Sequence, residues 1–338
     1  MSAATAAAAR FPARVRLRYY AIQNVPLLLS IGLLVAMIVV YDVLFTITQH
    51  RAPGTFEVST TVNNTLSVGL AGIGQTLVVL TGGIDLSVGG IVDLTNALAA
   101  QLMQASAGSM ILVSLVVLLV GAGAGLLNGL LVAFGRLQPI VVTLATLAIW
   151  QGVALLVLPQ PGGTIPATLS NVLSGTIPAL ANLPCGLVVL AVLILLWQVL
   201  RRTPFLSALY AIGNDERAAR ATGVPILRAK VGAYTLAGAF SGAAGLYFAA
   251  ANTSGDATAG NPFTLTSIAA VVLGGISLFG GRGSAIGALA GAFTLTLILH
   301  VLFFAGVNPQ LQNLFQGLFL VLAVVASTLV GRLLRRAR

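Results

Sequence analysis

The chain has 338 residues, of which 58% are hydrophobic and only 7% are charged. Soluble domains carry about 25% charged residues, so this composition excludes an ordinary soluble protein and indicates an integral membrane protein. The net charge of +10 does not point to a nucleic-acid partner, because the arginines stand in short clusters between long apolar runs, as membrane topology requires. A single cysteine, Cys185, excludes an intrachain disulfide.

The apolar runs predict an all-α fold, a polytopic transmembrane helix bundle. Runs of about twenty residues match a helix that crosses a hydrocarbon core of about 30 Å, whereas a barrel would alternate in segments of about ten. We expect about ten spans, and the third and eighth are short and rich in glycine, which is typical of broken or tilted helices. The predicted spans are 26–46, 60–81, 88–105, 109–134, 140–158, 185–200, 230–251, 263–280, 284–305 and 310–331.

The basic residues predict the orientation. Cytoplasmic connections carry an excess of Lys and Arg. With both termini in the cytoplasm, the basic clusters fall on the inner side and only Arg51 falls outside. This predicts a basic cytoplasmic segment at 1–25, one membrane domain at 26–331 and a basic cytoplasmic tail at 332–338. The outer connection at 160–184 is rich in Pro, Gly, Thr and Asn, and we expect a partly ordered external cap there.

The segment Leu80–Gly90, LTGGIDLSVGG, places Asp85 among glycines. A carboxylate at the centre of a bilayer helix costs roughly 3 kcal/mol, so we expect Asp85 in the turn between the second and third spans, near the cytoplasmic side. There it would accept hydrogen bonds from nearby backbone N–H groups or from Arg282. Two interpretations stay open, a plain turn and a functional one. A similar stretch, VVLGGISLFGG, starts at Val271 and indicates duplication or similar packing demands.

The connection at 201–230 is the charged one on the predicted inner side. Asn214 or Asp215 can cap a helix there, Glu216 suits its first turn, and Gly223 marks its end. We therefore expect a short surface helix of about two turns, with exposed alanines that let a partner approach. In the simpler interpretation this helix only anchors the sixth and seventh spans. The candidate contact residues are Asn214, Asp215, Glu216, Arg217, Ala218, Ala219, Arg220, Ala221 and Gly223.

Motifs for catalysis and for metal binding are missing from the sequence. There is no GxxxxGK[ST] nucleotide loop, and His50 and His300 lack partners at ligand spacing, so neither a catalytic site nor a metal site is predicted. Polar residues inside predicted spans usually face a bundle interior or a water-filled path. For each of them, a plain interhelical hydrogen bond is the alternative. The candidates for a translocation path are Gln75, Asp93, Asn96, Asn128 and Gln151.

Three stretches together resemble a known family. GQTLVVLTGGIDLSVGG at 74–90 resembles the signature of the permease subunits of ribose/xylose/galactose-type ABC importers. AIGNDERAARATGV at 211–224 is similar to the cytoplasmic coupling loop of that family, and 269–292 is similar to a third family stretch. The resemblance covers roughly residues 60–330. It assigns the signature turn to Gly82, Gly83, Asp85, Ser87 and Gly89.

The resemblance implies the permease subunit of an importer for monosaccharides or similar small polyols in the bacterial inner membrane. It implies a second permease subunit (the same or a related chain), a cytoplasmic ABC ATPase dimer and an extracytoplasmic sugar-binding protein. ATP and Mg would be bound by the ATPase and no cofactor by this chain, and 201–230 would be the coupling loop. Two residues depart from the family pattern: Arg217 replaces the first alanine of an E-A-A…G motif, and Asp93 replaces a small or apolar residue.

Two other classes of function remain as alternatives. An ion-coupled secondary transporter of a small polar solute needs carboxylates within the membrane, and Asp93 is the one serious candidate. A membrane scaffold or channel subunit needs no moving lever, and the capped, charged loop at 201–230 argues against it.

Overall fold

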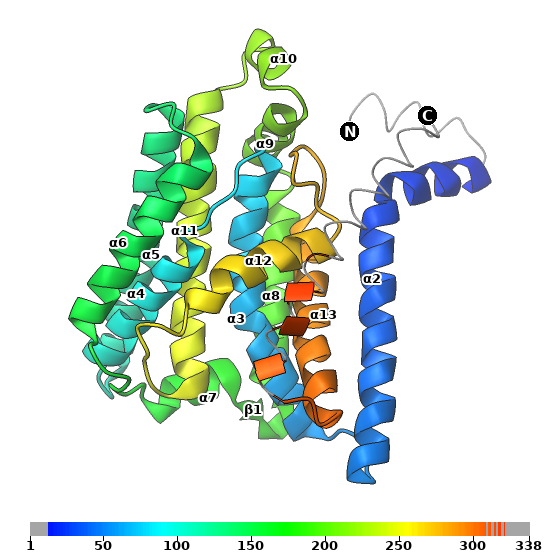
Figure 1. The fold of residues 1–338 in the computed structure, drawn as a ribbon, viewed down its shortest axis with the longest axis vertical. Coiled ribbons are helices and arrows are strands. Elements are labelled where there is room, and N and C mark those ends of the chain that lie inside the picture. Colours follow the sequence, from blue (N-terminus) through cyan, green and yellow to red (C-terminus); the bar gives the residue numbers. More distant parts are fainter. Residues whose placement is uncertain (1–12, 309, 312–313, 316, 319–320, 322–338) are drawn as a thin grey trace.

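The computed structural model describes residues 13–308, 310–311, 314–315, 317–318 and 321. Within these residues the chain is a bundle of helices with one two-stranded antiparallel sheet (Figure 1). The elements are α2 (Ala13–Gln49), α3 (Thr55–Leu80), α4 (Val88–Leu102), α5 (Ala107–Ala133), α6 (Pro139–Val157), α7 (Ala167–Ser174), β1 (Thr176–Ile177), η1 (Pro178–Leu180), β2 (Leu183–Pro184), α8 (Cys185–Leu200), α9 (Pro204–Asn214), α10 (Glu216–Ala221), α11 (Ile226–Asn252), α12 (Asn261–Leu273) and α13 (Ala285–Phe304).

Several helices have the length and the apolar composition of membrane spans. These are the Val25–Gln49 part of α2, together with α5, α6 and α13, and the bent pair of α8 and α9, which meet at 75°, adds a fifth candidate. Each predicted span up to residue 305 contains one helix, whereas the predicted span at 310–331 and the tail at 332–338 lie largely or wholly outside the described residues. An all-α, multi-pass membrane protein is therefore confirmed.

Two helices are too short to cross a membrane alone. Helix α4 has 15 residues and α12 has 13, so they rise about 22 Å and 20 Å, against a hydrocarbon core of about 30 Å. The predicted bounds 88–105 and 263–280 were wrong at their C-terminal ends, because α4 stops at Leu102 and α12 at Leu273. Figure 1 shows α12 crossing α3 obliquely. Before α4, the irregular segment 81–87 is buried or half-buried except at Gly82, a setting in which irregular backbone is tolerated within a membrane protein.

The two similar glycine stretches form the same helix end. After α3, Gly82 has φ 81°, and after α12, Gly275 has φ 73°, a left-handed conformation that glycine adopts without strain. Each end closes with the two crossed backbone hydrogen bonds of a Schellman motif. After α3, Gly82 N–H donates to Val79 O at 2.9 Å and Gly83 N–H to Val78 O at 3.3 Å. After α12, Gly275 N–H donates to Val272 O at 2.9 Å and Ile276 N–H to Val271 O at 3.1 Å. The sequence similarity between the two stretches thus encodes one turn geometry twice.

Helix α3 lies in the centre of the bundle and carries much of the core. Leu66 and Leu77 of α3 are fully buried, together with Leu206 and Leu209 of α9. Helices α5 and α11 approach closely, because a Cβ on Gly121 would lie 3.0 Å from the Cα of a glycine in α11. Small residues at such crossings let backbones pack together, which is how membrane helices associate.

The connection at 160–184, where a partly ordered cap was expected, contains regular secondary structure. It holds α7 and the small sheet at the end of the bundle opposite α10 (Figure 1). The Asn63 amide donates to Ser174 O at 2.7 Å, and the Tyr247 hydroxyl donates to the Asn63 side-chain oxygen at 2.8 Å. Ser170 donates to Ala250 O at 2.7 Å. The cap is therefore fastened to both α3 and α11.

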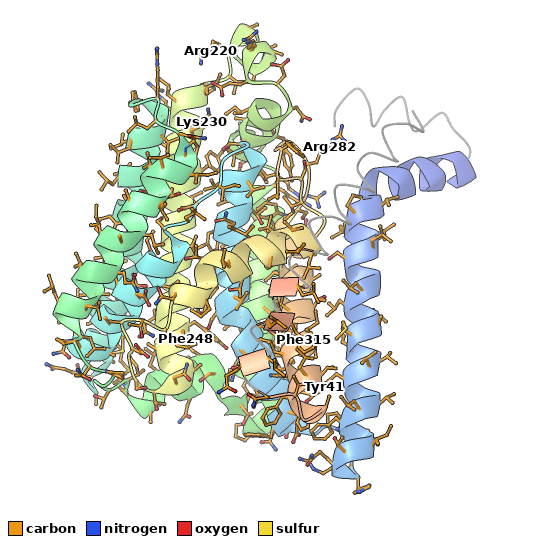
Figure 2. The ribbon with its side chains drawn as sticks, in the orientation of Figure 1. Tyr41, Arg220, Lys230, Phe248, Arg282 and Phe315 are labelled. Carbon is orange, nitrogen blue, oxygen red and sulfur yellow. The ribbon has the colours of Figure 1, made fainter. Side chains whose placement is uncertain are left out.

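Basic side chains gather at one end of the bundle. Figure 2 shows Arg220, Lys230 and Arg282 at the end that carries α9 and α10. Arg51 lies in the α2–α3 connection at the opposite end, where it forms an ion pair with Glu57. The folded chain thus separates these charges in space as the positive-inside pattern requires.

Candidate functional site

The surface helix predicted in the charged loop is present as α10. Asp215 precedes it, and its carboxylate accepts hydrogen bonds from the N–H groups of Arg217 at 2.8 Å and Ala218 at 3.1 Å. These are two of the N-terminal amides that a helix leaves without partners. Of the two candidate caps Asp215 is the right one, since Asn214 still belongs to the last turn of α9.

The predicted stop of α10 is also confirmed. Gly223 has φ 82°, and its N–H donates to Arg220 O at 3.1 Å, while Val224 N–H donates to Ala219 O at 3.1 Å. A Cβ on Gly223 would meet no atom within 4 Å. The requirement for glycine here is therefore conformational and not steric.

The side chains of α10 divide into an inner and an outer set. Ala219 is 4% exposed and packs in the core, so the expectation that it is an exposed contact residue was wrong. The reason is that α10 lies against α9 and must bury one face. Arg217, Ala218, Arg220 and Ala221 are exposed and form the outer face of α10.

Glu216 anchors α10 to α11. Its carboxylate bonds to Lys230 Nζ at 2.7 Å and to Arg220 at 3.3 Å. The hydrogen bond from Lys230 lowers the pKa of Glu216 below its usual 4.5, and Arg220 adds to this effect. Because the folded pKa is depressed, this anchor is complete above about pH 4.5 and is lost as the pH falls through the lower folded pKa.

We expect Glu216→Gln to raise hydrogen exchange of the α10 amides at pH 7 by up to about fivefold, since a partly exposed pair contributes about 0–1 kcal/mol. The difference between variant and wild type should vanish as the pH falls below the folded pKa of Glu216, where the wild type loses its own charge. Hydrogen exchange of 216–221, followed from pH 7 to below the folded pKa of Glu216, measures both effects, and a difference that persists after Glu216 is protonated in the wild type would contradict the role of the charge.

Helix α9 was missed by the sequence reasoning. Thr203 caps it by accepting from Leu206 N–H at 3.3 Å, and Pro204 is its first residue, so the Thr-Pro pair was the available signal. At its other end the side chain of Asn214 bonds within the protein. Its amide donates to Tyr210 O at 2.8 Å and to Gly281 O at 3.3 Å.

Asp85 is fully buried and locally bonded. Its Oδ1 accepts from the Ser87 N–H at 2.9 Å and from the Ser87 hydroxyl at 2.6 Å, as expected for an aspartate that fixes a turn. The expected contact with Arg282 was wrong, because Arg282 is exposed at the end of the bundle while Asp85 turns into the interior. Among the described residues Asp85 forms no ion pair, and its Oδ2 has no partner.

Two of the path candidates join this buried turn. Asn128 of α5 donates to the Ser87 hydroxyl at 2.8 Å and accepts from the Thr146 hydroxyl at 2.8 Å. With its amide turned so that both groups are satisfied, Gln75 of α3 donates to Asp85 O at 3.0 Å and accepts from Asp85 N–H at 3.3 Å. A hydrogen-bonded network of this kind favours one arrangement of the turn, since breaking one of its bonds would leave a buried polar group without a partner.

The other three path candidates bind the segment that leads into α12. Asp93 accepts from Gly260 N–H at 2.5 Å, so a carboxylate lies at the N-terminus of α12, where the helix dipole favours it. Asn96 accepts from Asp256 N–H at 2.7 Å, and Gln151 donates to the Asn261 side-chain oxygen at 2.9 Å. The five candidates therefore fall into two groups, one bonded to the turn before α4 and one bonded to the start of α12 and the segment before it.

Glycines of the signature turn allow close backbone contacts. A Cβ on Gly89 would lie 2.7 Å from Gly260 O, so the start of α4 touches the start of α12. A Cβ on Gly83 would lie 2.8 Å from the Tyr234 hydroxyl.

Within the described part of the chain, no group of three His, Cys, Asp or Glu residues is placed to hold a metal ion.

Comparison with known proteins identifies the family. Residues 57–324 match the family described as "Branched-chain amino acid transport system / permease component". The chain belongs to this family. The permease is similar to ribose import permease protein RbsC of Bacillus subtilis (strain 168), with 37% identity over 267 residues, covering 76% of the chain and 80% of the relative.

Two further relatives extend the comparison. Ribose import permease protein RbsC of Escherichia coli (strain K12) is 33% identical over 297 residues, covering 84% of the permease and 90% of the relative. Fructose import permease protein FrcC of Rhizobium meliloti is 39% identical over 267 residues, covering 76% and 73%. No solved structure matches the permease. Family membership supports the permease interpretation over the secondary-transporter and scaffold alternatives.

Proposed function

We propose that this chain is the transmembrane subunit of an ABC importer that forms the path for a monosaccharide or a similar small polyol. The observation that carries the proposal is its similarity, over about three quarters of the chain or more, to permeases named for ribose and for fructose import. The capped helix α10 supports it, because an importer driven by a separate ATPase needs a rigid element outside the membrane on which that ATPase can act.

Besides this chain, the proposed assembly has three protein components in the bacterial inner membrane and beside it. A second permease subunit completes the path, an extracytoplasmic binding protein delivers the sugar, and a cytoplasmic ATPase dimer binds ATP and Mg. The outer face of α10, with Arg217, Ala218 and Arg220, docks on the ATPase. Charge pairs at an exposed face contribute only about 0–1 kcal/mol each, so the shape and position of α10 determine docking more than its charges do.

The proposed mechanism is a two-state movement. ATP binding brings the two ATPase subunits together and displaces α10, and the helices then rock between inward-open and outward-open arrangements. Along the path, the sugar needs weak and replaceable hydrogen bonds, because a tight binding site would slow its release. Gln75, Asp93, Asn96, Asn128 and Gln151 are the proposed donors and acceptors, and each of them bonds to a protein partner in the described structure.

Reconstitution tests the proposed function. The permease is placed in vesicles with its ATPase and the binding protein encoded beside it, and uptake of radiolabelled ribose and fructose is measured. We expect uptake that requires ATP and the binding protein. Uptake driven by a proton or sodium gradient without the ATPase would support the secondary transporter instead, and the absence of both kinds of uptake would contradict transport of these sugars.

We further propose about ten spans with both termini in the cytoplasm. The gathering of Arg220, Lys230 and Arg282 at one end of the bundle supports this orientation. A reporter active only in the cytoplasm should give signal when fused after Arg220 or after Arg338, and none when fused after Ser170 in the cap. Signal at Ser170 with silence at Arg220 would reverse the orientation.

A further inference from the structure

Helix α9 lies between α10 and two glycine-rich turns, the first at 81–87 after α3 and the second at 274–284 after α12. Its last turn meets the backbone of Leu80, just before the first turn, and of Gly281 in the second. A Cβ on Gly213, in the last turn of α9, would overlap the carbonyl oxygen of Leu80 and the amide nitrogen of Gly281. Leu80 is the last residue of α3, and Gly281 belongs to the turn between α12 and α13. Three segments that are far apart in the sequence thus meet at one point through their backbones.

The contact is also fastened by hydrogen bonds. Gly281 N–H donates to Leu80 O at 3.0 Å, so the second turn is tied to the end of α3. A Cβ on Gly280 would lie 2.9 Å from both Gly213 Cα and Gly82 N, so the backbone of Gly280 is packed directly between α9 and the first turn. We call the contact among Leu80, Gly213, Gly280 and Gly281 the glycine joint.

Two side chains of α9 form hydrogen bonds to backbone carbonyl groups at and beside the glycine joint. Tyr210 donates through its hydroxyl to Gly283 O at 2.5 Å, and the Asn214 amide donates to Gly281 O at 3.3 Å. On the other side, one residue, Asp215, separates α9 from α10, and it is the C-cap of the first helix and the N-cap of the second. Because the connection is a single residue, a displacement of α10 also displaces the end of α9.

The first turn leads from the joint to the buried part of the molecule. Gly82 and Gly83 continue into Asp85, whose network with Gln75 and Ser87 positions the start of α4. Packed protein interiors have low compressibility, and backbone-to-backbone contacts hold no flexible side chain that could absorb a shift.

We propose that the glycine joint transmits the displacement of α10 to the turn at 81–87 and to α4, with Tyr210 and Asn214 as positioning residues. This inference rests on the proposed function only in so far as an ATPase moves α10. It assigns Asn214 an inward role in the permease, in place of the outward contact with the ATPase that its position in the loop suggested.

The test uses the complete importer in vesicles and two measurements. The first is sugar transported per ATP hydrolysed, which does not depend on the amount of folded protein. The second is the change in hydrogen exchange at 81–87 when ATP is added, which does not depend on the identity of the sugar. Gly213→Ala should keep the ATPase bound, lower sugar per ATP at least tenfold and abolish the ATP-dependent change in exchange.

Two further variants make the result decisive. Gly152→Ala is the matched control, because a Cβ on Gly152 meets nothing within 4 Å, and it should behave as wild type. Tyr210→Phe keeps the ring and removes the hydrogen bond to Gly283 O. It should lower both sugar transported per ATP and the ATP-dependent change in hydrogen exchange about threefold. If Gly213→Ala does not reach the membrane, Tyr210→Phe is the variant that tests the joint.

Wild-type values in Gly213→Ala, or in Tyr210→Phe where Gly213→Ala fails to fold, would overturn the joint. Loss of the ATPase from the Gly213→Ala complex would place the effect at docking and would overturn it too. If the wild type carries neither ribose nor fructose, the substrate class is wrong, and the exchange measurement still tests the joint.

Discussion

Replacing Gly223 with valine is expected to leave the protein in the membrane and to uncouple it from the proposed ATPase partner. Gly223 holds φ 82° in the cap that ends α10. A β-branched residue in this left-handed conformation costs roughly 1–2 kcal/mol, and the helix escapes the cost by unwinding its last turn or by tilting. The membrane helices do not share the cost, since their stability comes from packing elsewhere and from the bilayer.

The expected size of the effect follows from that energy. A cost of 1–2 kcal/mol disfavours the docked geometry of α10 about 5- to 30-fold, because 1.4 kcal/mol corresponds to a factor of ten. We therefore expect ATPase co-purification with Gly223→Val, or sugar-stimulated ATP hydrolysis in vesicles, to fall by about that factor.

Gly223→Asn is the matched control. Asparagine tolerates the left-handed conformation, and the space around Gly223 is open, so this variant should stay within about twofold of wild type. Wild-type coupling in Gly223→Val would remove α10 from the mechanism. Equal losses in both variants would show that the side chain blocks docking and that the backbone conformation is not the cause.

Replacing Asp85 with alanine is expected to give the largest loss of stability. The carboxylate accepts two hydrogen bonds from Ser87 inside the bundle, and Ser87 in turn accepts one from Asn128. Alanine leaves the buried Ser87 N–H without its acceptor, and an unsatisfied buried donor costs about 1–3 kcal/mol on top of the lost bond. We expect a decrease in the free energy of unfolding of about 2–4 kcal/mol and a marked loss of uptake.

Asp85→Asn separates the acceptor from the charge. Its side-chain oxygen can still accept from Ser87, and in the described structure Asp85 has no ion pair to lose, so the change should stay below about 1 kcal/mol with uptake retained. Thermal unfolding in detergent and uptake in vesicles measure both variants. A loss with Asn as large as that with Ala would show that the negative charge itself has a role.

Local signals were read correctly because they depend on neighbouring residues. Asp215 caps α10 and Gly223 ends it through bonds that reach two to five residues along the chain. The two Val-Val-Leu stretches end their helices with the same crossed bonds for the same reason. Composition determined the class of protein, and the length of the apolar runs located the helices to within a few residues at most ends.

Contacts between distant segments could not be read in this way. Ala219 and Ala218 are adjacent and chemically identical, yet only Ala219 is buried, because α9 lies on one side of α10. The same holds for the path candidates, whose partners lie up to 167 residues away, as in the bond from Gly260 to Asp93. Polarity inside a span indicates that a partner exists and does not say which residue it is.

By itself, the sequence determined that this protein is an all-α membrane permease with a capped helix between its sixth and seventh predicted spans. The tertiary structure alone decided that Asp85 is buried, that α4 and α12 are too short to span, and that Gly213 lies against Leu80 and Gly281. The physical reason is one of range. Caps and turns are closed by hydrogen bonds between near neighbours, whereas burial and backbone contact depend on which segments the whole bundle brings together.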